Sequence, residues 1–131
     1  MGKYKLINNV LGWVTFAISS IVYLMTMEPT ASFWDCGEFI SSAYKLEVGH
    51  PPGAPFFMLV ANLFSQFASD PSTVAKMVNY MSALMSGACI LFLFWSITHL
   101  VRKLVATDEN NITKGQLITI MGSGLVGALA Y

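Results

Sequence analysis

Two long apolar runs constrain this chain more than any other feature of its sequence. They cover residues 10–27 and 77–101, and neither contains an acidic residue, a lysine or an arginine. A helix needs about 20 mostly apolar residues to cross a bilayer, and both runs are long enough. Because 55% of all residues are hydrophobic and only 11% are charged, little charge remains to cover a soluble surface. We therefore expect an all-α integral membrane protein.

The first run could instead belong to a cleaved signal peptide. The apolar part of such a peptide is about 7–15 residues long and ends at an A-x-A-like site. The run at 10–27 is longer, and the sequence Glu-Pro-Thr-Ala-Ser that follows it is a poor cleavage site. The sequence favours an uncleaved first span over about residues 8–27.

Two shorter segments between the long runs are predicted to form helices at the membrane surface. In the segment 32–47, polar and apolar residues recur at helical spacing on opposite faces. The polar face holds Asp35, Glu38, Ser42 and Lys45, and the apolar face holds Phe33, Gly37, Ile40 and Tyr44. The second segment, 54–68, contains an apolar run of only 14 residues. As a helix this run measures about 21 Å, against a hydrocarbon core of about 30 Å, so we expect an interfacial helix.

The positions of the basic residues predict the topology. If 54–68 does not cross, five basic residues lie inside and two lie outside, as the positive-inside rule requires. The inside set is Lys3, Lys5, Arg102, Lys103 and Lys114, and the outside set is Lys45 and Lys76. The predicted order is a cytoplasmic N-terminus, the first span, an external loop 28–73, a span 74–105, a cytoplasmic loop 106–115 and an incomplete span from 116. We expect an N-terminal piece of a longer protein, located in the bacterial inner membrane.

The external loop holds the residues that could carry chemistry. Five of the seven acidic residues fall in it, namely Glu28, Asp35, Glu38, Glu47 and Asp70. Asp35 and Glu38 share one helix face beside the membrane, where a carboxylate could act as a general base or bind a divalent cation. The alternative is structural, because Ser32-x-x-Asp35 matches a capping box. Spacing alone favours the cap.

Other polar and aromatic residues also leave alternatives open. His50 could meet a lipid phosphate or could be a turn residue without a function, and Trp34 could stack on a sugar or anchor the chain in the membrane interface. Asn79, near the start of the second span, suggests a hydrogen bond between helices. The net charge is zero, and no basic patch indicates nucleic-acid binding.

The order of these motifs resembles a known family. A first span is followed by the sequence FWDCGEFI at residues 33–40, then by Gly49-His50-Pro51-Pro52-Gly53-x-Pro55, and then by Val78-Asn79 at the next span. This resembles the N-terminus of the protein O-mannosyltransferase-like family of polytopic membrane proteins, within the GT-C superfamily of lipid-phospho-sugar-dependent glycosyltransferases.

The resemblance implies a GT-C-like fold whose first external loop forms part of the active site. It implies that Asp35 is the catalytic base or a ligand of a divalent cation such as Mg²⁺ or Mn²⁺, with Glu38 as its neighbour. It also implies that His50 faces the lipid-phosphate donor, and we assign Trp34 and Lys45 to substrate or lipid-phosphate binding as well.

The implied reaction moves a sugar, mannose or a similar hexose, from a polyprenyl-phosphate carrier to a Ser or Thr hydroxyl of an exported protein. The expected partners are the lipid bilayer, the donor, the acceptor protein and subunits of a membrane complex, without nucleic acid. The alternative is a non-catalytic membrane subunit or scaffold of a larger complex. A transporter ranks third, because no acidic residue lies at the middle of a span.

Overall fold

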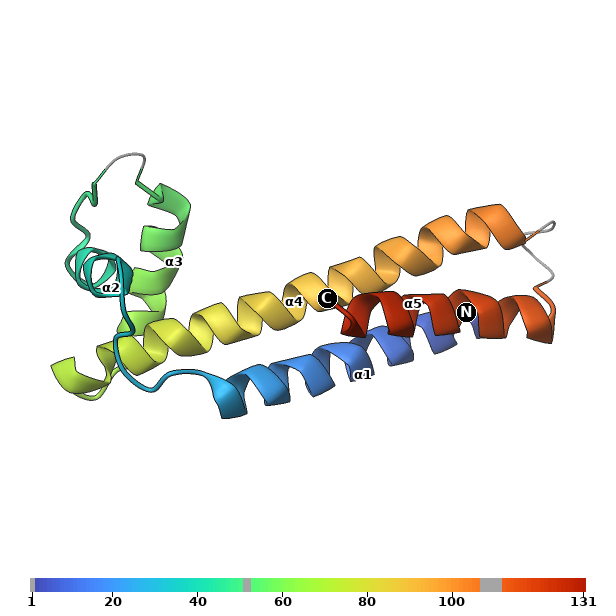
Figure 1. Ribbon diagram of the computed structural model, residues 1–131, viewed down its shortest axis with the longest axis horizontal. Coiled ribbons are helices and arrows are strands. Elements are labelled where there is room, and N and C mark those ends of the chain that lie inside the picture. The colour runs from blue at the N-terminus through green and yellow to red at the C-terminus, as the bar shows by residue number, and fades with distance from the viewer. Residues whose placement is uncertain (1, 51–52, 107–111) are drawn as a thin grey trace. The chain divides into compact units, whose positions relative to one another are not determined.

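The computed structural model describes residues 2–50, 53–106 and 112–131, and these residues form helices and loops without a strand. The elements are α1 (Lys3–Thr26), α2 (Cys36–Lys45), α3 (Pro55–Ser65), the 3-10 helix η1 (Pro71–Thr73), α4 (Val74–Val105) and α5 (Lys114–Leu129) (Figure 1). Two helical stretches, Lys3–Thr26 and Pro71–Val105, are long and apolar enough to cross a membrane. The all-α prediction is confirmed, and the two candidate spans coincide with the two long apolar runs.

The chain divides into two compact units. Unit 1 consists of Met1–Tyr23 and Met85–Tyr131, and unit 2 consists of Leu24–Leu84. The bounds and sidedness of the predicted topology stay predictions, and most of the predicted cytoplasmic loop 106–115 lies outside the described residues.

Unit 1 packs α1, α5 and the C-terminal part of α4 around an apolar cluster. Its buried members are Ile90, Phe94, Ile120, Met121 and Ala128. Gly124 allows close packing, because a Cβ atom there would lie 2.5 Å from Thr98 Cγ2 and 2.9 Å from a ring carbon of Phe94. Gly124 and Ala128 are both buried and lie one turn apart, so this pair of small residues brings α5 against α4.

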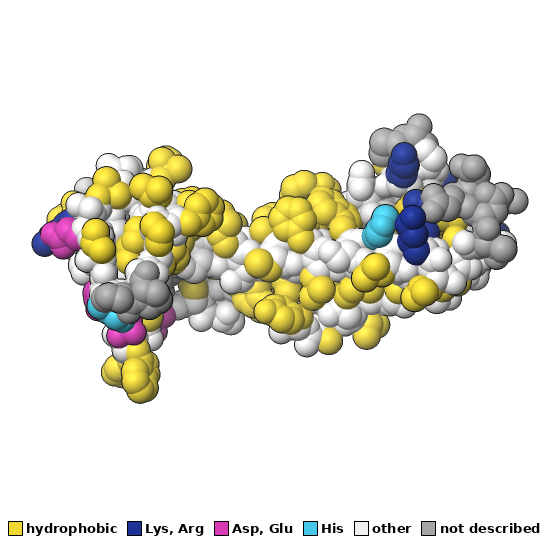
Figure 2. Space-filling model, turned by 90° about the horizontal axis from the view of Figure 1, so that it is seen from above, with side chains coloured by type: hydrophobic (Ala, Val, Ile, Leu, Met, Phe, Trp, Pro, Cys, Tyr) yellow, Lys and Arg dark blue, Asp and Glu magenta, His cyan; other side chains and the backbone are white. Residues whose placement is uncertain are grey.

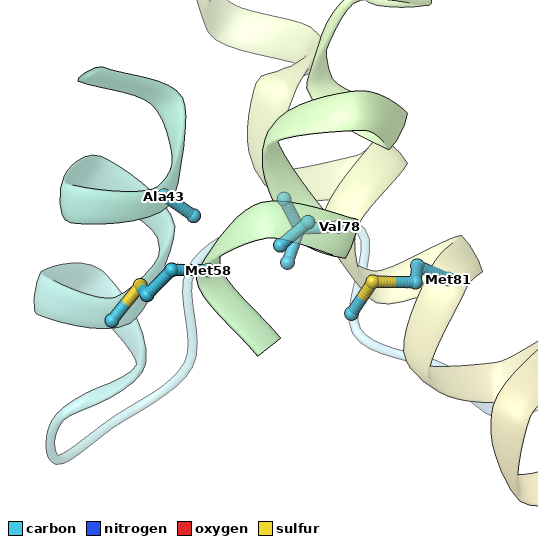
Figure 3. Close-up of a cluster of buried hydrophobic side chains, with 5 residues drawn as sticks. Ala43, Met58, Val78 and Met81 are labelled. Atoms are coloured by element: carbon cyan, nitrogen blue, oxygen red, sulfur yellow. The ribbon is translucent and has the colours of Figure 1, made fainter. Parts of the chain in front are cut away.

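Unit 2 packs α2 and α3 against the first turns of α4. Its core contains Ala43 from α2, Met58 and Ala61 from α3, and Val78 and Met81 from α4. Figure 3 shows that the labelled side chains of this core come from all three helices. The loop that carries the predicted site residues is thus a packed structure with its own core.

Helix α2 is shorter than the predicted segment 32–47, and two left-handed residues explain its limits. Trp34 has φ +64° and therefore cannot continue a right-handed helix, so α2 begins at Cys36. At the other end Leu46 has φ +54°, and the N–H groups of Leu46 and Glu47 donate to the carbonyls of Ala43 and Ser42. This is a Schellman motif with leucine in the position that glycine usually takes.

The buried side of α2 also differs from the predicted apolar face. Phe39, Ile40 and Ala43 pack into the core of unit 2, whereas Phe33 is 87% exposed and Tyr44 is exposed. The predicted face assumed that a helix had already started at Ser32. Since the apolar residues of α2 contact protein, the location of α2 at the membrane surface stays a prediction.

Local sequence explains the limits of the next two helices. Pro55 occupies the first turn of α3, where its missing N–H leaves no hydrogen bond unmade. α3 ends at Ser65, earlier than the predicted 68, in tight turns with Phe67 N–H donating to Phe64 O. Asp70 then accepts a hydrogen bond from Ser72 N–H at 2.8 Å and starts η1, which leads directly into α4.

Candidate functional site

Three of the predicted site residues come together at the start of α2. Asp35 directly precedes the helix, Glu38 lies in its first turn, and His50 comes from the loop that follows. Each of them offers one ligand atom, and these atoms all lie within 4.8 Å of one another. All three residues are exposed. Figure 2 shows acidic side chains and a histidine gathered on one surface of the part of the chain that forms unit 2.

Glu38 and His50 form a double hydrogen bond. Glu38 Oε1 accepts the backbone N–H of His50 at 2.8 Å, and Glu38 Oε2 lies 2.7 Å from His50 Nδ1. The ring of Phe39 meets the His50 ring edge to face, with the centroids 6.4 Å apart. Since these contacts join α2 to a residue 12 positions further on, they fix the loop over the start of the helix.

The same contacts shift the pKa values of both side chains. The hydrogen bonds from the backbone and the ring of His50 lower the pKa of Glu38 below its usual value. The hydrogen bond to Glu38, its negative charge and that of Asp35 raise the pKa of His50. These shifts stabilise the ionised form of Glu38 and the protonated form of His50. Glu38 is therefore a poor proton acceptor.

The side chain of Asp35 does not cap α2. The residue occupies the N-cap position of α2 with φ −76° and ψ 0°, and its side chain makes no cap hydrogen bond. The capping box predicted with Ser32 is wrong, because the left-handed Trp34 moves the helix start beyond the reach of Ser32. The Asp35 carboxylate is consequently not held by backbone amides and stays exposed.

An apolar groove opens beside Asp35. It has a volume of about 460 Å³ and lies between α2, α3 and α4. Besides Asp35, its walls include Phe39, Ile40, Phe57, Val78 and Ser82. A single carboxylate at the edge of an apolar groove can meet a ligand that combines a polar reacting group with an apolar body.

The structure separates the two remaining predicted site residues. Trp34 also lines this groove, and with its left-handed backbone the residue is 96% exposed. Lys45 lies at the other end of α2, about 15 Å along the helix from Asp35, with its Nζ 4.0 Å from Glu47 Oε1. Lys45 is thus not part of the Asp35–Glu38–His50 cluster. Pro51 and Pro52 of the predicted motif lie outside the described residues.

Asn79, which lines the groove, and Asn62 hold the segments around the site, and the sequence indicated this role for neither. Asn79 does not join two membrane helices, as was predicted. Its Nδ2 donates to Glu28 O at 2.7 Å and to Thr30 O at 3.0 Å, in the segment that leads to Asp35. Asn62 Nδ2 donates to the carbonyls of Ala43 and Tyr44 at 2.9 Å and 3.1 Å, at the end of α2.

The donor atoms of the cluster fit a divalent cation. Two carboxylates and an imidazole suit Mn²⁺ better than Mg²⁺, which prefers oxygen ligands and water. The Asp35 carboxylate takes no part in the hydrogen bonds between Glu38 and His50, so it could bind the cation without breaking them. Glu38 and His50 would have to exchange their mutual hydrogen bond for the metal.

Comparison with known proteins identifies relatives for most of the chain. Residues 35–131 match the family described as the protein O-mannosyl-transferase TMEM260 N-terminal domain. Two relatives are named protein O-mannosyl-transferase TMEM260. The protein from Dictyostelium discoideum is 32% identical over 83 residues, which are 63% of this chain and 10% of the relative. The protein from Mus musculus is 34% identical over 85 residues, which are 65% of this chain and 12% of the relative.

The chain therefore spans about a tenth of the length of these two relatives. No solved structure matches it significantly. The apolar helices and the relatives indicate a membrane protein. The predicted resemblance is confirmed: this chain belongs to the family of the protein O-mannosyl-transferase TMEM260 N-terminal domain.

Proposed function

We propose that this chain contributes the catalytic loop of a GT-C-type membrane glycosyltransferase. In this proposal the enzyme moves mannose or a similar hexose from a polyprenyl-phosphate carrier to a Ser or Thr hydroxyl of an exported protein. The observation that carries it is the Asp35–Glu38–His50 cluster beside an apolar groove, in a chain whose relatives are named protein O-mannosyl-transferases.

Asp35 is the proposed general base. Its carboxylate takes the proton from the acceptor hydroxyl while the hydroxyl oxygen forms a bond to the anomeric carbon of the sugar. The bond between that carbon and the carrier phosphate breaks, and the phosphate leaves with the electron pair. Asp35 suits this step better than Glu38, because both Glu38 oxygens are hydrogen-bonded to His50 and its pKa is lowered.

His50 and Trp34 are proposed to bind the donor. A protonated His50 beside Asp35 places a positive charge where the carrier phosphate would lie, and its raised pKa favours that form. Trp34 is exposed at the groove and can stack on a sugar ring. Lys45 lies at the far end of α2, so it could bind the donor only through a phosphate group other than the one that His50 contacts. The alternative within this proposal is a divalent cation held by Asp35, Glu38 and a neutral His50, which would neutralise charge on the leaving phosphate in place of protonated His50.

The topology belongs to the same proposal. The N-terminus is cytoplasmic, and the loop 28–73 faces the outside, where an exported acceptor is available. The two relatives come from eukaryotes, so they lend no support to a bacterial inner membrane. In a protein whose Cys36 and Cys89 have been changed to serine, labelling from outside should modify Lys45→Cys and Lys76→Cys but not Lys114→Cys. External labelling at position 114 would refute the proposed topology.

The decisive experiment replaces Asp35 by Asn in the intact protein and measures transfer of radiolabelled mannose from polyprenyl-phosphate mannose to an acceptor protein. The loss of a general base typically costs about 10²–10⁴-fold in rate. Glu47→Asn is the matched control, because Glu47 is an exposed acidic residue of the same loop outside the cluster. Transfer at the wild-type rate by Asp35→Asn would refute Asp35 as the base.

The alternative of a non-catalytic membrane subunit has lost one of its supports. It relied on a structural role for Asp35, and the side chain makes no cap hydrogen bond. A subunit of this kind would show no transfer with wild-type protein and would protect the external loop through a partner, which the same assay and limited proteolysis can detect.

A further inference from the structure

The segment that carries Asp35 has little of its own to hold it in place. It runs from the end of α1 at Thr26 to the start of α2 at Cys36, and every residue from 28 to 35 is exposed. Neither burial nor a helix therefore fixes its path, and Trp34 adds a left-handed backbone directly before Asp35. A segment of this kind keeps one conformation only through contacts with a packed part of the protein.

Asn79 supplies this contact. Its Nδ2 group donates to Glu28 O at 2.7 Å and to Thr30 O at 3.0 Å, so both amide hydrogens are used. Within the described part of the chain, no other hydrogen bond joins residues 28–34 to a different element. The remaining side-chain bond of this stretch is internal, from Thr30 Oγ1 to Glu28 Oε1.

The helix that carries Asn79 also forms a wall of the Asp35 groove. Asn79 and Ser82 of α4 line this groove together with Asp35. On the same helix, Val78 and Met81 are buried in the core of unit 2, which holds this part of α4 rigidly. Asn79 thus joins the exposed segment to the packed helix against which Asp35 has to be placed.

We propose that Asn79 is a positioning residue for Asp35. By fixing residues 28–30 against α4, it sets the place of the Asp35 carboxylate beside the groove, and Asp35 follows Thr30 after five residues. A misplacement of about 1 Å can cost about 10²-fold in rate. The inference rests on the proposed function, because it requires Asp35 to be the base, and Asn79 itself contacts no reacting atom.

The test compares variants of two asparagines in the intact protein. Asn79→Ala removes both hydrogen-bond donors, and Asn79→Asp keeps the size of the side chain but has no amide hydrogen to donate. Asn62→Ala is the matched control, because Asn62 Nδ2 also donates to two carbonyls, at the end of α2 away from Asp35. The assay measures transfer of radiolabelled mannose from polyprenyl-phosphate mannose, with kcat and the KM for the donor determined separately.

We expect kcat to fall by about 10- to 100-fold in both Asn79 variants, with the KM for the donor unchanged, because the base is misplaced while substrate contacts remain. Asn62→Ala removes as many hydrogen bonds but should keep kcat near the wild-type value. In a protein that already carries Asp35→Asn, Asn79→Ala should lower the residual rate little further, since it acts through Asp35.

Hydrogen exchange gives a second measurement that does not require activity. The amides of residues 30–35 should exchange faster in both Asn79 variants and at the wild-type rate in Asn62→Ala. Unchanged exchange in the Asn79 variants would show that Asn79 does not hold this segment, and would overturn the proposal.

The kinetic outcomes separate this proposal from the proposed function. A wild-type kcat in either Asn79 variant would overturn the positioning role. A raised KM with unchanged kcat would also overturn it, because Asn79 would then bind the donor directly, as would an equal fall of kcat in Asn62→Ala. Failure of the proposed function has a different result, in which Asp35→Asn alone transfers mannose at the wild-type rate.

Discussion

Side-chain hydrogen bonds reach much further along the sequence around the candidate site in unit 2 than they do within α1 of unit 1. In unit 1, Thr15 and Ser19 of α1 donate to carbonyls four residues back in their own helix, at 2.8 Å and 2.9 Å. In unit 2, Asn79 and Asn62 reach backbone carbonyls that lie far away in the sequence. A membrane helix satisfies its backbone groups within the helix, and Thr15 and Ser19 add bonds of the same short range. The segments around the candidate site are instead fixed by contacts between residues distant in the sequence.

This difference predicts that unit 1 depends on close packing. Gly124→Leu should destabilise the protein by about 1–3 kcal/mol or more, because the new side chain would collide with Thr98 and the buried Phe94. Thermal unfolding in detergent micelles measures the effect. Gly122→Leu is the matched control, since a Cβ there meets nothing within 4 Å. Equal effects of the two substitutions would contradict the close packing of α5 on α4.

Unit 2 should depend on its long-range hydrogen bonds. Asn62→Ala removes two of them and leaves the carbonyls at the end of α2 without this donor, so we expect a loss of about 1–2 kcal/mol. Hydrogen exchange of α2 should increase, while that of α5 should not change. Asn9→Ala, at an exposed position of α1, should have little effect. Uniformly faster exchange in both helices would show that the contrast between the units is not real.

The left-handed backbone of Leu46 is sterically unfavourable for a residue with a side chain, and it costs unit 2 stability. Leu46→Gly should stabilise the protein by about 1 kcal/mol, because glycine adopts φ +54° without a steric cost and Leu46 is already 57% exposed. Chemical denaturation measures the change. The control is Leu63→Gly, where glycine enters the middle of α3 and should destabilise. Destabilisation by Leu46→Gly would mean that the leucine side chain contributes more than its backbone costs.

The pH dependence of the Glu38–His50 pair is the smallest predicted effect, since both side chains are exposed. The raised pKa of His50 means that its contribution is complete below its ordinary pKa of 6.5 and is lost as the pH rises through the raised value. The lowered pKa of Glu38 means that its contribution is complete above its ordinary pKa of 4.5 and is lost as the pH falls through the lowered value. The pair should therefore stabilise the loop most between these two ordinary values.

Limited proteolysis of the loop 46–50 at a series of pH values measures this dependence. Wild-type protein should be most resistant between the ordinary pKa values of Glu38 and His50. His50→Gln, which keeps a hydrogen-bonding side chain without the titration, should be cleaved at a rate that varies less with pH. A wild-type cleavage rate that does not vary with pH would refute the prediction.

Much of the fold follows from local sequence. Pro55 and the sequence around Asp70 set the starts of α3 and α4, and the apolar runs predicted both candidate spans. The predicted start of α2, Ser32, lies four residues before the observed start, Cys36. The left-handed backbone of Trp34 causes this difference, and it leaves no clear pattern in the sequence. The predicted surface location of α2 and α3, and the catalytic and binding roles of the site residues, stay predictions.

The sequence by itself determined the helical class, the two candidate spans, the family and the choice of Asp35, Glu38 and His50 as candidate residues. The helical class and the spans follow from periodicity and charge, which are properties of neighbouring residues. The family and the three candidate residues follow from the resemblance of the motif order to a known family. Only the tertiary structure decided that Asp35 does not cap α2, that Glu38 is occupied by His50, and that Asn62 and Asn79 hold the segments around them. These contacts join residues 12 to 51 positions apart, and their formation depends on how the core of unit 2 packs.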